Sequence, residues 1–238
     1  MVPRILREHD LQARAGAQFG DAIRRLEVPD VRDGFRFEPV RAATEEQVRA
    51  SLSVVGPVAF QNKMTDIRGT TSRRVARIDE EDQVTIETVV DDALEQQMIA
   101  DAKDVTSARV AGAVARHVQN GGRATVHDNV QRDRVALGWI RVTRETPCYF
   151  CAMLASRGIE WGPYSEKSFD RSDARFTGEG RAKVHDACQC SVKPVYSEDD
   201  ALLEQSKRFE DLWYQYSSGS GAKAILTFRQ GYEGRSVK

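Results

Sequence analysis

The chain has 238 residues, 40% of them hydrophobic and 30% charged, which is enough apolar content for one large folded domain or two small ones. Its 35 Lys and Arg residues are balanced by 36 Asp and Glu residues, and this near-zero net charge disfavours a protein that holds nucleic acid mainly by bulk charge. No apolar run approaches the roughly 18 residues of a membrane helix, and charged residues interrupt the N-terminus, so we expect a chain without a membrane span or secretory signal that folds in a reducing cytoplasm.

Helical signals dominate residues 1–135. Apolar residues recur at three- and four-residue steps from Leu11 to Leu26 and include Phe19, which predicts a helix packed on that face, with arginines on the other. Thr44 and Gln47 resemble a capping box, so a second helix is expected to begin there and to end at the Gly56-Pro57 break.

Three further helices are predicted before residue 135. Four-residue spacing predicts a helix from Thr85 to about Val105, with one buried stripe made of Ile86, Val90, Leu94 and Met98. A helix over Ala108–Gln119 should be capped by Thr106 or Ser107 and ended by Asn120-Gly121-Gly122, and a polar helix should follow over Ala124–Arg134. His117 and His127 are then expected on the surface.

The pattern changes at Leu137 to that of a small α+β module over residues 136–196. Strands are predicted at Leu137–Thr143, Ile159–Trp161 and Ser191–Val195, and a short helix at Pro147–Gly158. We expect a helix over residues 197–216. The remaining residues, 217–238, are predicted to form a flexible tail or arm that orders on a partner. The expected fold is therefore a mainly α N-terminal region with a small α+β C-terminal module, stapled by zinc.

That staple is predicted from the cysteines, all four of which lie in the module. Cys148 and Cys151 form one knuckle, and His185, Cys188 and Cys190 form a second. A structural zinc ion takes four nitrogen or sulfur ligands, and a two-residue gap lets both sulfurs of the first knuckle reach the same ion. These five residues are the candidate ligands, and the sequence does not select four of them. A module of about sixty residues has too small a core to be stable without such a cross-link.

Other chemistries for the cysteines stay open at this point. They could form two disulfides in an oxidising medium, or remain plain thiols. A zinc deaminase would need a His-x-Glu, which the sequence lacks. A cysteine nucleophile activated by His185 and oriented by Asp186 remains possible, although cysteines at metal spacing are more often ligands.

Five segments together resemble the Mu F-like (MuF) minor head proteins of tailed phages that infect actinobacteria. The similarity spans about residues 50–196, and its cysteine-rich half is the specific part. The segments are Ala50–Val58, Ala115–Arg123, Gly138–Thr143, Pro147–Gly158 and His185–Cys190.

The resemblance implies a minor capsid protein that acts in head morphogenesis. Such a protein would bind portal or major capsid subunits, and would lie inside the head near the portal after assembly in the host cytoplasm. Relatives of this kind are often labelled capsid maturation proteases, so a protease or other hydrolase using Cys148 or Cys151 with His185 is the alternative, although the chain offers no protease triad. Contact with packaged DNA through paired arginines, Arg73-Arg74 or Arg132 and Arg134, is a third and weaker option.

Overall fold

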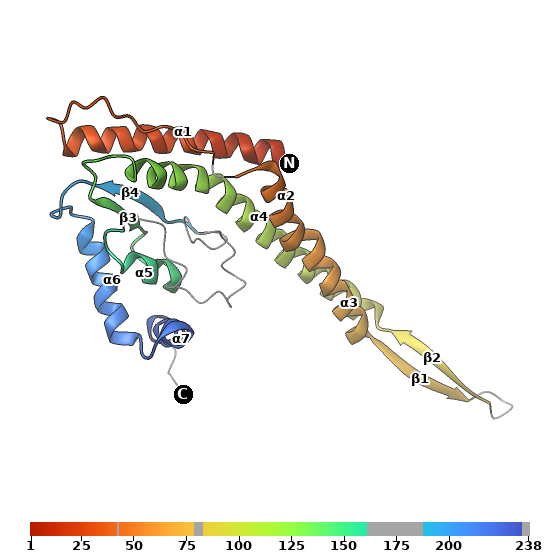
Figure 1. Ribbon diagram of the computed structural model, residues 1–238. Coiled ribbons are helices and arrows are strands. Elements are labelled where there is room, and N and C mark those ends of the chain that lie inside the picture. The colour runs from red at the N-terminus through yellow and green to blue at the C-terminus, as the bar shows by residue number, and fades with distance from the viewer. Residues whose placement is uncertain (42, 79–82, 161–187, 235–238) are drawn as a thin grey trace. The chain divides into compact units, whose positions relative to one another are not determined.

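The computed structural model describes residues 1–41, 43–78, 83–160 and 188–234. The chain forms two compact units, one made of residues 1–45 and 115–238 (unit 1) and the other of residues 46–114 (unit 2). Helices predominate, and the strands form two small antiparallel sheets (Figure 1). The expected fold class is confirmed. No helix of the described residues is both long and apolar enough to cross a membrane.

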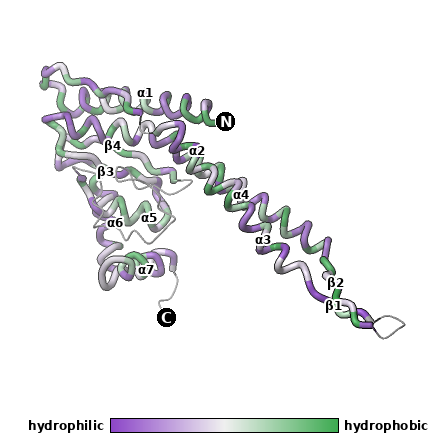
Figure 2. The backbone as a smooth tube through the Cα atoms, turned by 45° about the vertical axis from the view of Figure 1, so that its right-hand side comes forward, coloured by the Kyte–Doolittle hydropathy of each residue, from purple (hydrophilic) through white to green (hydrophobic). Residues whose placement is uncertain are grey.

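Unit 1 is organised around two helices that lie side by side, α1 (Val2–Glu27) and the last part of α4 (Asp92–Val130) (Figures 1 and 2). Their backbones almost touch: a Cβ atom added to Gly121 would lie 2.1 Å from the His9 carbonyl oxygen, and one added to Gly16 would lie 2.7 Å from that of Gly122. The prediction that Asn120-Gly121-Gly122 ends a helix is therefore wrong. These glycines lie inside α4, where they permit close contact with α1.

The helix predicted at the N-terminus is confirmed, but its buried face is not the predicted one. Leu11, Phe19 and Leu26 are 43% to 76% exposed. Because α4 approaches so closely, the face of α1 that meets it carries mainly small side chains and includes two polar ones. The buried residues are Val2, Ile5, His9, Ala13, Ala17, Gly20 and Arg24.

A two-stranded sheet and two helices complete the centre of unit 1. Strands β3 (Gly138–Val142) and β4 (Ser191–Val195) pair antiparallel with Ile140 opposite Lys193, and α5 (Tyr149–Ala155) and α6 (Leu203–Tyr216) pack beside them. These strands and α5 confirm the predicted α+β elements. Of the strand predicted at Ile159–Trp161, the described part makes a single bridge between Glu160 and Trp139.

The chain after Ser217 differs from the predicted arm. Helix α7 (Gly221–Tyr232) packs against α6, where the fully buried Phe228 lies 5.0 Å from Trp213 between ring centroids. The Tyr232 hydroxyl also donates a 3.0 Å hydrogen bond to the Pro147 carbonyl. Residues 217–220, which are Ser and Gly, form the turn between α6 and α7, where Gly219 has a φ of +81°.

Unit 2 contains a helical stretch, a β-hairpin and the first part of α4. Helices α2 (Glu45–Ser53) and α3 (Ala59–Thr71) are joined by a π-helical turn, η1 (Val54–Val58), which contains Pro57. The helix predicted from Thr44 is confirmed, but it does not break at Gly56-Pro57. The wider π turn accommodates a proline that has no N–H to donate.

The helix predicted from Thr85 is wrong in its first part. Residues Val84–Val90 form strand β2, which pairs antiparallel with β1 (Ser72–Ile78), and α4 begins only at Asp92. The four-residue spacing of Ile86 and Val90 also fits a strand, since both positions are even-numbered and lie on one face. Helix α4 then continues without interruption to Val130, so the helix starts predicted at Thr106 or Ser107 and at Ala124 are wrong.

Candidate metal centre

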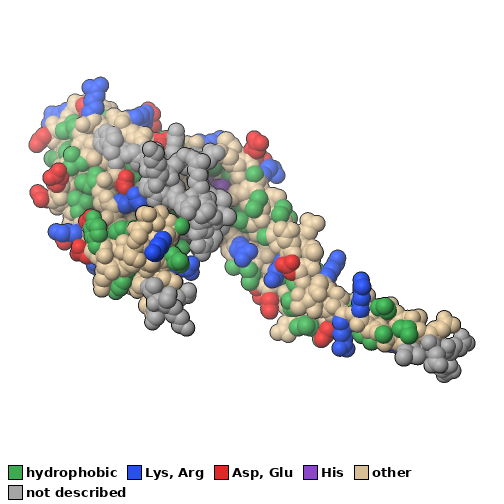
Figure 3. Space-filling model, turned by 60° about the horizontal axis from the view of Figure 1, so that its bottom comes forward, with side chains coloured by type: hydrophobic (Ala, Val, Ile, Leu, Met, Phe, Trp, Pro, Cys, Tyr) green, Lys and Arg blue, Asp and Glu red, His purple; other side chains and the backbone are tan. Residues whose placement is uncertain are grey.

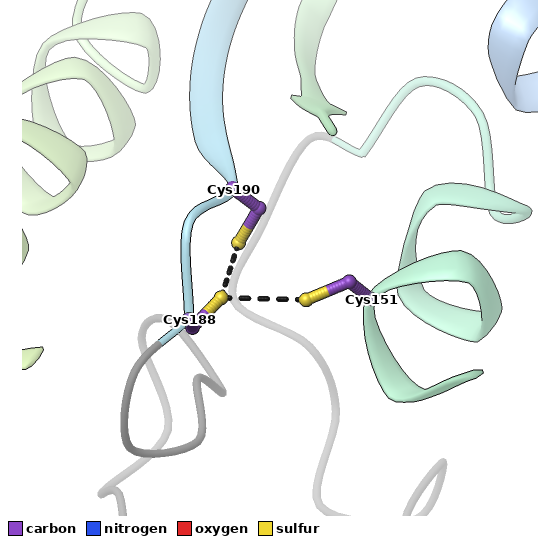
Figure 4. A group of neighbouring side chains, drawn as sticks. All are labelled: Cys151, Cys188 and Cys190. Carbon is purple, nitrogen blue, oxygen red and sulfur yellow. Dashed lines mark hydrogen bonds between the residues drawn. The ribbon is translucent and has the colours of Figure 1, made fainter. Parts of the chain in front are cut away.

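Three cysteine thiols meet in the interior of unit 1. Cys151 lies in α5, and Cys188 and Cys190 lie in the segment that leads into β4 (Figure 4). The Cys188 sulfur is 3.3 Å from that of Cys151 and 2.8 Å from that of Cys190, and all three sulfurs lie within 4.8 Å of one another. All four cysteines are free, since a disulfide bond would be about 2.0 Å long. The three buried thiols could hold a metal ion.

Cys148 lies at the edge of this cluster as the N-cap of α5. Its sulfur accepts a hydrogen bond from the Cys151 backbone N–H at 3.4 Å, and its side chain is half-buried against the other three cysteines. The two-residue gap thus places Cys148 and Cys151 on the first turn of α5, with Cys148 as its N-cap.

Two buried arginines, which the sequence reasoning missed, support the cluster. Arg123 on α4 donates from Nε to the Cys190 carbonyl at 2.8 Å, and from Nη2 to the Cys188 carbonyl at 3.0 Å. Arg141 on β3 is 2% exposed, and its Nη1 atom lies 2.6 Å from the Cys190 sulfur. Arg123 therefore fixes the backbone at Cys188 and Cys190, and Arg141 places a positive charge beside the Cys190 sulfur. The sequence did contain a signal for Arg141, since it is the one charged residue of an otherwise apolar strand. A charge in such a strand is buried and needs a buried partner.

The electrostatics of the cluster favour one thiolate among protonated thiols. Hydrogen bonds from Cys151 and Cys188, together with the charges of Arg141 and Arg123, hold the pKa of Cys190 well below its usual range. Hydrogen bonds to the other cysteines, and burial, raise the pKa of Cys151. A cation that replaced the shared protons would let more of these thiols ionise, as metal binding requires.

A small pocket opens beside the cluster. It has a volume of about 90 Å³ and is lined by Thr143, Arg144, Pro147, Cys148, Cys151, Gln189 and Cys190. Ligand sites for drug-sized molecules measure roughly 300 Å³ or more, so this pocket fits an ion or a few waters rather than a peptide or sugar. It gives a path by which an ion could reach the sulfurs.

The histidines contribute differently from their predictions. His185 and Asp186 lie outside the described residues. His117 and His127 are 7% and 2% exposed, so the prediction that they lie on the surface is wrong. The backbone of His117 accepts a 2.7 Å hydrogen bond from His9, and the His127 ring packs against Trp139 at 5.4 Å between centroids. These two histidines are buried because α4 packs against both α1 and β3, which cover the side of the helix that was predicted to face solvent.

Comparison with known proteins identifies the family. The family model described as VG15 protein matches residues 7–217, which is most of the chain. No curated protein and no solved structure gives a match. The chain therefore belongs to the VG15 family, a family of viral and phage gene products, and is a phage protein.

Proposed function

We propose that this VG15 protein is a minor capsid protein of the phage head, with a structural zinc centre that stabilises unit 1. In this role it binds portal or major capsid subunits on the inside of the head, near the portal. The observation that carries the zinc centre is the cluster of three buried thiols, in which Arg123 holds the carbonyls of Cys188 and Cys190. The proposed role in the head is supported by membership of a phage protein family and by the resemblance to minor head proteins. Such a centre serves as a cross-link, since four protein ligands leave no open position on the ion for a water or a substrate.

Cys148, Cys151, Cys188 and Cys190 are the ligand set that the surroundings support. Thiolate ligands suit zinc, which is commonly bound by four cysteines in two knuckles. Four thiolates around Zn²⁺ carry two net negative charges, and the guanidinium groups of Arg123 and Arg141 supply two positive charges in the same buried region. A single ion bound this way joins α5 to the segment before β4, which are distant in sequence.

Metal analysis of the purified full chain tests this ligand set. We expect about one zinc ion per chain, from a single four-ligand site. Cys148→Ser, Cys151→Ser and Cys188→Ser should each lose the ion, whereas His185→Asn should retain it. Ala155→Ser is a matched control, because it also places a hydroxyl at a buried position of α5. Retention by Cys148→Ser with loss in His185→Asn would replace Cys148 with His185, and metal-free folded protein would refute the zinc proposal.

Genetic complementation tests the role in the head. A phage lacking this gene should accumulate incomplete heads, and the wild-type gene supplied in trans should restore them. Cys151→Ser should fail to restore heads because unit 1 loses its cross-link, whereas Ala155→Ser should succeed. If Cys151→Ser instead gave normally assembled heads that contain uncleaved capsid subunits, the structural role would be refuted in favour of a maturation protease.

A further inference from the structure

The β1–β2 hairpin of unit 2 has exposed residues on both of its strands. Its two strands follow α3 and precede α4, and among the described residues no third strand pairs with either edge (Figure 1). Almost every residue of β2 is exposed. An isolated two-stranded hairpin is marginally stable in water, and a free edge is a template for another strand. Within the described part of the chain the hairpin therefore has two unpaired edges, which a partner strand can complete.

The two edges carry opposite charges. Strand β1 contains three arginines and no acid, and β2 contains Glu87 as its one charged residue. Arg77 and Glu87 form an ion pair of 2.9 Å within the hairpin, and both side chains remain more than half exposed. Arg73 is exposed and has no acidic partner among the residues that the structure describes. A strand that pairs with the β1 edge should therefore carry an acidic residue.

One face of the hairpin also carries large apolar side chains, beside Arg74 and Thr88. Directly opposed residues share a face, and Ala76 lies opposite Ile86 on the face that also carries Val84 and Val90. The exposed fractions of Val84, Ile86 and Val90 are 63%, 70% and 41%. Hydrophobic side chains, coloured green, are visible on the surface of the hairpin in Figure 3. A partner strand on either edge would add its own apolar residues to this face. The apolar side chains of the hairpin would then be less exposed on the side that meets the partner strand.

Charge argues against nucleic acid as the partner. Residues 72–90 contain three arginines but five acidic residues, four of them consecutive at positions 79–82. A polyanion would be repelled by this hairpin as a whole. A strand with β-branched residues and one carboxylate is needed for the β1 edge, and β2 of another copy has that composition.

We propose that the hairpins of neighbouring copies pair edge to edge, with β2 of one chain on the outer edge of β1 of the next. Within one chain, Glu87 lies opposite Val75 and so diagonally between Arg73 and Arg77. The same register between chains would bring Glu87 of one copy beside Arg73 and Arg77 of its neighbour. Because two different edges meet, the contact is heterologous and can repeat, giving a ring if the rotation closes. This inference concerns unit 2 and is independent of the zinc centre.

Sedimentation analysis of the full chain at increasing concentration tests the pairing. The wild type should self-associate, and Arg73→Glu or Glu87→Arg alone should raise the dissociation constant tenfold or more, which corresponds to about 1.4 kcal/mol of association free energy. Mixing the two variants should restore association, because the glutamate edge of one meets the arginine edge of the other. Arg32→Glu, an exposed charge change in unit 1, is the matched control and should associate like the wild type.

Two results would overturn the proposal. The first is a wild-type chain that stays monomeric up to about 100 µM, the range in which weak specific contacts form. The second is association that resists both charge reversals but is abolished by Ile86→Glu, which would mean that the apolar faces, and not the edges, make the contact. In either case recovery of association in the mixture would not be seen.

Discussion

Replacing Gly121 with alanine tests the close packing of α1 on α4. The new methyl group would lie 2.1 Å from the His9 carbonyl oxygen and 3.1 Å from the Ala13 nitrogen, both of them backbone atoms that cannot rotate away. The two helices must separate, which also strains the 2.7 Å hydrogen bond from His9 to the His117 carbonyl. Alanine therefore destabilises the fold here even though it is the better helix former.

The magnitude follows from three effects. Overpacking in a core costs about 1–3 kcal/mol, and the rigid backbone places this site at the upper end. Loss of the hydrogen bond costs about 1 kcal/mol more, and alanine returns about 1 kcal/mol through its higher helix propensity. We expect a net loss of about 3 kcal/mol, which lowers the melting temperature by roughly 6–12 °C in a chain of this size.

Thermal melts followed by circular dichroism measure this change. Gly69→Ala is the matched control, because Gly69 is also inside a helix but has nothing within 4 Å of an added Cβ atom. It should gain about 0.4–1 kcal/mol. Gly121→Ala melting at or above the wild-type temperature would refute the close approach of the two helices.

Three further outcomes are expected elsewhere in unit 1. Asp133→Asn removes the carboxylate that accepts hydrogen bonds from the buried Arg24 (2.8 Å) and from Tyr196 (2.9 Å), so urea unfolding should show a loss of about 3 kcal/mol; a negligible change would contradict a buried ion pair. Burial raises the pKa of Glu160, so the contribution of this group to folding stability is present below its unfolded pKa and is lost as pH rises through the folded pKa. Glu160→Gln should therefore melt at a higher temperature than the wild type at pH 7 and at the same temperature near pH 4. A difference in melting temperature that persists at pH 4 would exclude this cause. Phe228→Ala removes a fully buried ring and should cost up to about 3–5 kcal/mol at the docking of α7, seen as faster proteolysis after Ser217, whereas unchanged cleavage would mean that α7 is not packed.

The local elements around the cysteines were predictable because their signals are local. A run of β-branched and aromatic residues indicates the β3 strand, and the two-residue gap between Cys148 and Cys151 indicates a shared helical turn. The structure also brings Cys188 and Cys190, the described cysteines of the second knuckle, next to Cys151 of the first. The support from Arg123 was not predictable in this way, because its partners are carbonyl groups more than sixty residues away.

The errors have a common physical cause, which is that tertiary contacts changed the meaning of a local signal. Gly121 and Gly122 suit a helix end, but inside a helix they also allow a second helix to approach, and only the presence of α1 decides between the two. Ile86 and Val90 fit either a helix stripe or one face of a strand, and pairing with β1 selects the strand. Polar neighbours suggested that His127 is exposed, but Trp139 covers it.

A cryo-EM map of the assembled phage head tests the central claim most directly. We predict density that fits unit 1 on the inner side of the head near the portal, in contact with portal or capsid subunits. Strong density for a bound ion is expected among Cys148, Cys151, Cys188 and Cys190. A complete head in which this chain is absent, or lies on the outer surface, would contradict the proposed role.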